Sequence, residues 1–212
     1  MEPSLGIPIV ILVSAGAAAV PVAWLLVRSG RLSIWAAMSS LFAILGVVSL
    51  GTERLRAGGD ISAPAAAGLG LGAAIVFYAV TVAFVAGAAS LPLVGRQTEQ
   101  LYAARSVLPL SSAVGLTGLV AAGEELFWRG LTYGVAAHVA GDVGGGALVL
   151  AGYVLTNAAS GSLPVTLAAL VGGAVWGGLA LGTGGVLASM VCHAAWSSLM
   201  VAFPPARPSA GS

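Results

Sequence analysis

Uncharged apolar runs dominate this sequence and decide what it can fold into. Residues 6–27, 32–50 and 61–95 contain no charged side chain. Each run has about the ~20 residues that an α-helix needs to cross a bilayer, or more. In hydrocarbon every backbone N–H and C=O must be bonded within the chain, so such runs cross as helices. The sequence therefore predicts an all-α fold, a polytopic membrane helical bundle.

The composition agrees with a membrane protein and excludes a nucleic-acid binder. Of the 212 residues 58% are hydrophobic and 7% are charged, and the mean hydropathy is +1.03. A soluble domain carries roughly 25% charged residues. The cations are all arginines that occur singly or in pairs, so no basic patch is present. We expect the lipid bilayer as a partner and no nucleic acid. The arginine-only composition favours a bacterial host, and hence its inner membrane.

Hydropathy predicts about seven transmembrane helices. The first run has no basic n-region and no clear cleavage site, so we expect it to be retained as a span and not removed as a signal peptide. A connection over 91–109 follows the third span and is expected to include an interfacial helix. The predicted spans are Ile7–Val27, Leu32–Leu50, Pro64–Ala88, Ser111–Ala137, Ala147–Ala159, Pro164–Leu181 and Val186–Phe203.

These spans suggest a simple domain organisation. Residues 1–110 would form the N-terminal transmembrane helices with their interfacial connection, and residues 111–203 a catalytic helical core. The tail, 204–212, is rich in Pro, Ser and Gly and is expected to be disordered.

Charged residues interrupt the fourth predicted span, in 119-LVAAGEELFWRGLTYG-134. A charge at the bilayer centre costs at least ~2.5–3.5 kcal/mol, so the default reading of such residues is functional. Glu125 and Arg129 are four residues apart and share a helical face, where they can pair. Glu124 is rotated by about 100° from Glu125, so Arg129 cannot easily neutralise both carboxylates. One carboxylate is then left to act as a general base on water. The alternative is a purely structural salt bridge between helices.

Other polar groups are predicted at membrane depth on different spans. His193 lies in the last span with Ser197 four residues later, and Asn157 lies four residues after Tyr153 in the fifth. Together with the Glu pair they predict one shared polar pocket within the bundle. The single cysteine, Cys192, excludes an intrachain disulfide and a multi-cysteine metal site. One His and one Asn make a poor zinc site, so we expect no metal and no other cofactor.

Two of these segments resemble the motifs of a known family. GEELFWRG resembles the first motif, EExxxR, of the CPBP family of intramembrane glutamic proteases, which includes the CAAX prenyl endopeptidases and bacteriocin-processing relatives. HAAWS, from His193 to Ser197, is similar to the third motif, a His followed four residues later by Asn or a small residue. The resemblance covers roughly Leu119 to Met200.

The resemblance implies a role for each matching residue. Glu124 would be the general base that activates the attacking water, and Glu125 with Arg129 the supporting ion pair. His193, with Ser197, would donate to the oxyanion of the tetrahedral intermediate, where a lost donor costs ~10²–10³ in rate. The implied mechanism needs neither a covalent acyl-enzyme nor a metal.

The second family motif, FxxxH, is where this sequence departs. Its best candidate is Tyr153-Val-Leu-Thr-Asn157, with Tyr for Phe and Asn for His. An asparagine can orient a water molecule but cannot take up a proton at neutral pH. Either Glu124 works as a base without that histidine, or the protein is a weakened or inactive relative. His138, the other histidine of the chain, is expected at a span end, away from the site.

The leading hypothesis is therefore an intramembrane endopeptidase that cuts a membrane-associated protein or peptide. In a bacterium a leader peptide, a signal-peptide remnant or the anchor helix of a surface protein would suit it better than a prenylated protein. The competing hypothesis is an inactive relative that binds or escorts membrane partners. A small transporter would also place charges at the midplane, but no repeat of the charged motif supports it.

Overall fold

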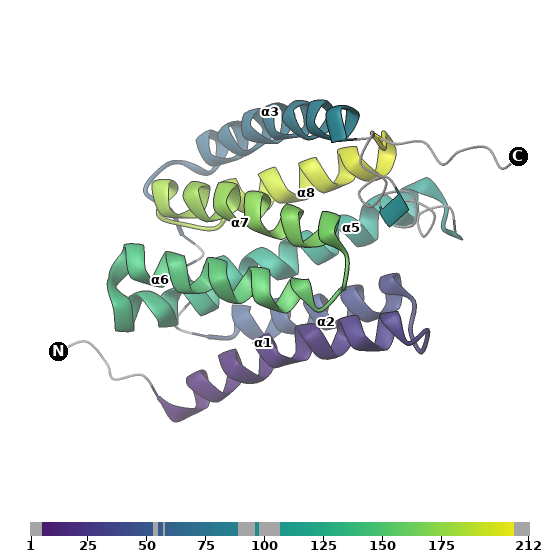
Figure 1. Ribbon diagram of the computed structural model, residues 1–212. Helices are drawn as coiled ribbons and strands as arrows, with labels where there is room; N and C mark the ends of the chain where they lie inside the picture. Colours follow the sequence, from purple (N-terminus) through teal and green to yellow (C-terminus); the bar gives the residue numbers. More distant parts are fainter. Residues whose placement is uncertain (1–5, 53–54, 57, 89–95, 98–106, 206–212) are drawn as a thin grey trace, which may run out of the picture.

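The computed structural model describes residues 6–52, 55–56, 58–88, 96–97 and 107–205. Within these ranges the regular structure is entirely helical, as the sequence predicts (Figure 1). The elements are α1 (Ile7–Arg28), α2 (Ile34–Leu50), α3 (Ala63–Ala88), α5 (Leu110–Glu125), the π-helix η2 (Leu126–Thr132), α6 (Tyr133–Ala158), α7 (Leu163–Thr183) and α8 (Leu187–Ala202).

The helices have the length and composition of a membrane protein. Among the described residues, four helical runs are long and apolar enough to cross a bilayer: Ile7–Arg28, Ala63–Gly87, Leu110–Ala158 and Leu163–Thr183. Two shorter apolar helices, α2 and α8, accompany them. The predicted membrane bundle is confirmed, with six runs where the sequence predicts about seven spans. The difference arises because the predicted fourth and fifth spans form one helical run of 49 residues.

That long run folds back on itself at Gly141. The backbone there has φ 70° and ψ 172°, a conformation that only glycine adopts without strain. The two legs of α6 then lie close together, because a Cβ added at Gly145 would stand 2.6 Å from the backbone nitrogen of Ala137. The sequence predicts a broad break over 138–146, whereas the structure confines the reversal to one residue. His138 is exposed just before it.

The run α5–η2 lies at the centre of the bundle. α5 packs against α2 and α8, and η2 packs against α2, α6 and α7 (Figure 1). Phe127, Trp128 and Leu131 of η2 are at most 1% exposed. The sequence predicts an unbroken α-helix here, and the structure shows a π-helical segment instead. π-helical segments occur frequently at functional sites.

Two predictions fall largely on residues outside the described ranges. The interfacial helix expected within 91–109 is described only at 96–97 and 107–109, and the tail only at 204–205. The division at residue 110 stays a prediction. The helices on either side of it are in direct contact, since α2 packs on α5 and α1 on α6.

The contact between α2 and α5 requires a glycine at position 123. A Cβ added there would collide with the backbone carbonyl oxygen of Phe42, which cannot move aside as a side chain can. We expect Gly123→Ala to lower the free energy of unfolding by about 2–3 kcal/mol, within the range for overpacked cores. Thermal melting in detergent measures this loss.

Gly115→Ala is the matched control on the same helix. A Cβ at Gly115 meets no atom within 4 Å, so this substitution gains helix propensity without a clash. Equal melting temperatures for the two variants would contradict the close contact of α2 and α5.

Candidate active site

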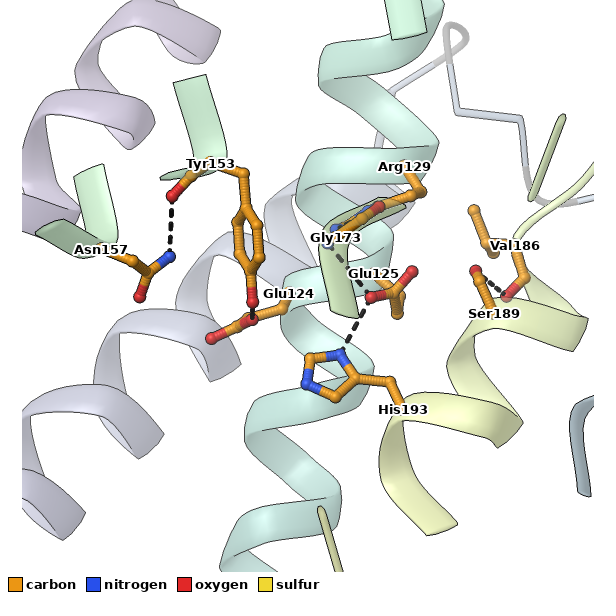
Figure 2. A network of polar contacts seen from close by, with 9 residues as sticks. All are labelled: Glu124, Glu125, Arg129, Tyr153, Asn157, Gly173, Val186, Ser189 and His193. Carbon is orange, nitrogen blue, oxygen red and sulfur yellow. Dashed lines mark hydrogen bonds and ion pairs between the residues drawn. The ribbon is translucent and has the colours of Figure 1, made fainter. Parts of the chain in front are cut away.

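A network of buried polar side chains crosses the bundle at the junction of α5 and η2. Glu124 and Glu125 end α5, and Arg129 follows one turn later in η2. The second leg of α6 contributes Tyr153, and α8 contributes His193 (Figure 2). Residues from separate helices thus meet around the carboxylate pair.

Glu125 is held by two cationic or potentially cationic partners. Its Oε1 accepts a hydrogen bond from the Arg129 guanidinium at 3.2 Å, the pairing that their spacing predicts, and contacts His193 Nδ1 at 2.9 Å (Figure 2). Glu125 is fully buried and Arg129 is 3% exposed. A charge buried this deeply needs such partners, because the bilayer interior does not solvate it.

Arg129 is fixed from the other sides as well. Its second terminal nitrogen donates to the carbonyl oxygen of Gly173 in α7 at 3.4 Å. The guanidinium lies 4.3 Å from the ring centroid of Tyr153 and 5.5 Å from that of Trp176, within the range of cation–π attraction. Its position is therefore set by α5, α6 and α7 together.

His193 is held by a hydrogen bond and by ring stacking. When Glu125 is ionised its oxygens only accept, so Nδ1 of His193 must carry the hydrogen in their contact. The imidazole stacks on Trp176 with ring centroids 3.5 Å apart and planes inclined by 15°. Nε2 is then the nitrogen left for other chemistry. It accepts when the ring is neutral and donates when the ring is doubly protonated.

Glu124 has different partners from its neighbour. Its Oε2 accepts a hydrogen bond of 2.6 Å from the Tyr153 hydroxyl (Figure 2). Its side chain is 8% exposed, and Arg129 and His193 are close enough to act on it electrostatically without a hydrogen bond to it among the described contacts. The two adjacent carboxylates therefore have different partners. Glu125 forms an ion pair with Arg129, whereas Glu124 accepts a hydrogen bond from the phenol of Tyr153.

Asn157 is engaged in structural hydrogen bonds. Its amide nitrogen donates to the backbone oxygen of Tyr153 at 3.0 Å, and its amide oxygen accepts from Trp24 Nε1 of α1 at 3.2 Å. Among the described hydrogen bonds, Tyr153 is what links it to Glu124. Ser197 is half-buried one turn beyond His193, and the hydrogen bonds described for the carboxylate pair do not include it.

Comparison with known proteins identifies the part of the chain that holds this network. Residues 106–199 match the family model described as type II CAAX prenyl endopeptidase, Rce1-like. This segment is similar to the CAAX prenyl endopeptidases that the model describes. It runs from the residues before α5 into α8 and contains every site residue named above except Trp24. Neither the curated proteins nor the solved structures give a match.

Within the matched segment, sequence reasoning missed two aromatic contributions. It treated Tyr153 as a substitute for phenylalanine, yet the hydroxyl that distinguishes the two residues is what contacts Glu124. A tyrosine at membrane depth was the available signal, since a buried hydroxyl usually finds a partner. Trp176, which stacks on His193, gave no signal beyond being aromatic.

The described residues were also compared with the requirements of a metal site. Among them, no group of three or more His, Cys, Asp or Glu side chains is arranged to hold a metal ion. The carboxylates are instead engaged by Arg129, His193 and Tyr153. The network described is thus one of hydrogen bonds and ion pairs.

Proposed function

We propose that the protein is an intramembrane endopeptidase that hydrolyses a peptide bond of a membrane-associated protein or peptide with a water molecule activated by Glu124. The observation that carries the proposal is that two adjacent buried carboxylates have different bonding partners. Glu125 pairs with Arg129 and contacts His193, while among the described hydrogen bonds Glu124 has the Tyr153 hydroxyl as its single donor. The similarity of residues 106–199 to the CAAX prenyl endopeptidases supports a membrane protease role.

The proposed reaction begins with attack by water. Glu124 takes a proton from the water molecule while the water oxygen bonds to the scissile carbonyl carbon. The carbonyl oxygen thereby becomes an oxyanion. Nε2 of His193 donates to that oxyanion when the ring is doubly protonated, because Nδ1 is already committed to Glu125. Collapse of the intermediate breaks the C–N bond, and the proton held by Glu124 passes to the leaving amine.

The proposed positioning groups keep this arrangement fixed. Arg129 and Glu125 orient His193, and Tyr153 orients Glu124. Orientation of this kind accounts for much of enzymatic rate enhancement because it is present before the substrate binds. The proposed location is a bacterial inner membrane, with the substrate drawn from leader peptides, signal-peptide remnants or anchor helices.

The proposal is tested by cleavage in reconstituted vesicles. The purified protein is incubated with membrane-anchored reporter peptides in ¹⁸O-labelled water, and the products are analysed by mass spectrometry. We expect internal cleavage, with one ¹⁸O in each new carboxylate and no adduct on the protein. Absence of cleavage across a broad set of reporters, in vesicles where the chain is folded, would contradict the proposed function.

A second candidate function is that of an inactive relative that binds membrane partners. The observation that favours it is the position of the Tyr153 hydroxyl on Glu124, together with Asn157, which cannot accept a proton. In this case the network would serve to hold the bundle together and to present a binding surface.

Variants of the second motif distinguish the two candidates. We expect Tyr153→Phe to lower the cleavage rate roughly 10- to 100-fold, since a hydrogen bond to a charged group contributes about 1.5–3 kcal/mol. Tyr153→Phe/Asn157→His should recover part of that rate, because it restores the Phe and His of the family motif at both positions and supplies an imidazole that can take up a proton. Cleavage by this double variant alone, with none by the native protein, would establish the inactive relative instead.

A further inference from the structure

A groove lies between the second leg of α6 and α7. Its volume is about 270 Å³. The α6 wall is apolar, and most of the α7 wall is formed by small residues, with Leu181 as its one large side chain: Gly173, Ala174, Gly177, Gly178, Ala180 and Leu181. The polar or charged side chains among its lining residues are Arg129 and Tyr133. The groove is thus apolar apart from the side chains of Arg129 and Tyr133.

The inner end of the groove reaches the candidate active site. Arg129 and Gly173 both line it, and they are joined by the hydrogen bond of 3.4 Å. A Cβ added at Gly173 would stand 3.1 Å from the Tyr153 ring, whose hydroxyl donates to Glu124. One residue therefore separates the groove from the proposed catalytic carboxylate.

The outer end of the groove lies beside the reversal at Gly141, where the chain turns back toward the bilayer. Tyr133, which lines the groove, donates to Asp142 at 2.8 Å. Asp142 also pairs with Arg56 at 3.3 Å, and both side chains are exposed, by 68% and 44%. Exposed charges at a helix turn are expected at the membrane boundary and not in hydrocarbon. The groove thus runs from that boundary to the active site.

The α7 wall is open at its middle. A Cβ added at Gly177 or at Gly178 would meet no atom within 4 Å, so none of the described helices covers this stretch. Added side chains there would project into unfilled space. The absence of side chains at these positions therefore leaves room that a ligand can occupy.

The chemistry of the groove indicates its occupant. A peptide bond inside a helix is hydrogen-bonded and shielded by side chains, so a segment must unwind before water can attack it. An unwound apolar segment gains free energy when its side chains are kept out of water, and the small residues of α7 leave room for them. We propose that the α6–α7 groove is the subsite that receives the apolar side chains of the unwound substrate segment beside the scissile bond. This inference rests on the proposed protease function.

The test fills the groove without disturbing the fold. Gly177→Leu and Gly178→Leu place a side chain in the open space, and Gly182→Leu is the control. Gly182 lies on the same helix, its added Cβ also meets no atom within 4 Å, and it does not line the groove. All three substitutions raise helix propensity, so none is expected to unfold α7.

The measurement is kcat/KM for reporter peptides that carry Ala, Leu or Phe beside the scissile bond. We expect Gly177→Leu and Gly178→Leu to cut the Leu and Phe reporters about 10- to 200-fold less efficiently, the range for lost apolar pocket contacts, and to cut the Ala reporter nearly normally. Gly182→Leu should behave as the native protein. Native behaviour of the groove variants across the series, while Glu124→Gln is inactive, would overturn the subsite and leave the protease function intact.

A binding measurement keeps the two proposals separable if the native protein cleaves no reporter. The Glu124→Gln protein in vesicles is titrated with a fluorescent, uncleaved Leu-containing reporter peptide. Weaker binding after Gly177→Leu but not after Gly182→Leu would support the groove as a binding site even without proteolysis. Equal binding by all variants would overturn it.

Discussion

Replacing Glu124 by glutamine is expected to lower kcat/KM for peptide cleavage by about 10²–10⁴-fold, the usual contribution of a general base. The substitution changes almost no volume, and the amide oxygen can still accept the hydrogen bond that the Tyr153 hydroxyl now gives at 2.6 Å. The fold should therefore survive, with a melting temperature close to the native value. Cleavage assays in vesicles and thermal melting in detergent measure the two effects separately.

Glu124→Asp is the informative companion. It keeps a carboxylate but moves it by one methylene away from the Tyr153 hydroxyl, so we expect activity between the native and Glu124→Gln values. A Glu124→Gln protein that cleaves as fast as the native one would remove Glu124 from the mechanism. A loss of activity that is accompanied by a large drop in melting temperature would mean that the role of Glu124 is structural.

Arg129→Met is expected to cause the largest loss of stability in the candidate site, about 3–5 kcal/mol. The reason is the environment of Glu125, which is fully buried and would lose its guanidinium partner while keeping its contact with His193 at 2.9 Å. The variant also loses the hydrogen bond from Arg129 to the Gly173 carbonyl. At ~2–4 °C per kcal/mol for a chain of this size, the melting temperature should fall by on the order of 10 °C.

The double variant Arg129→Met/Glu125→Gln separates lost charge pairing from lost packing. Replacing both members of a buried ion pair is often nearly neutral for stability, whereas removing one member leaves an uncompensated charge. We therefore expect the double variant to regain most of the melting temperature while remaining inactive, because His193 is no longer held by a carboxylate. A double variant as unstable as Arg129→Met would show that packing of the guanidinium against Tyr153 and Trp176 dominates.

The membrane fold could be read from the sequence because its determinants are local. α1, α2, α3, α7 and α8 begin and end within a few residues of the predicted spans, since bilayer thickness and hydropathy set helix length. The pairing of Glu125 with Arg129 was accessible for the same reason, because the two residues lie four positions apart. The π-helical conformation of Leu126–Thr132 could not be predicted, since hydropathy and residue spacing do not distinguish it from an α-helix.

The sequence by itself determined that the chain crosses a membrane in helices, that it places a carboxylate pair inside them, and that Arg129 holds one of the two carboxylates. Only the tertiary structure decided the rest of the network. His193 meets Glu125 across 68 positions, Tyr153 meets Glu124 across 29, and Trp24 meets Asn157 across 133. Contacts of this kind depend on which faces of separate helices pack together. Hydropathy fixes the lengths of those helices but not their rotation about their axes.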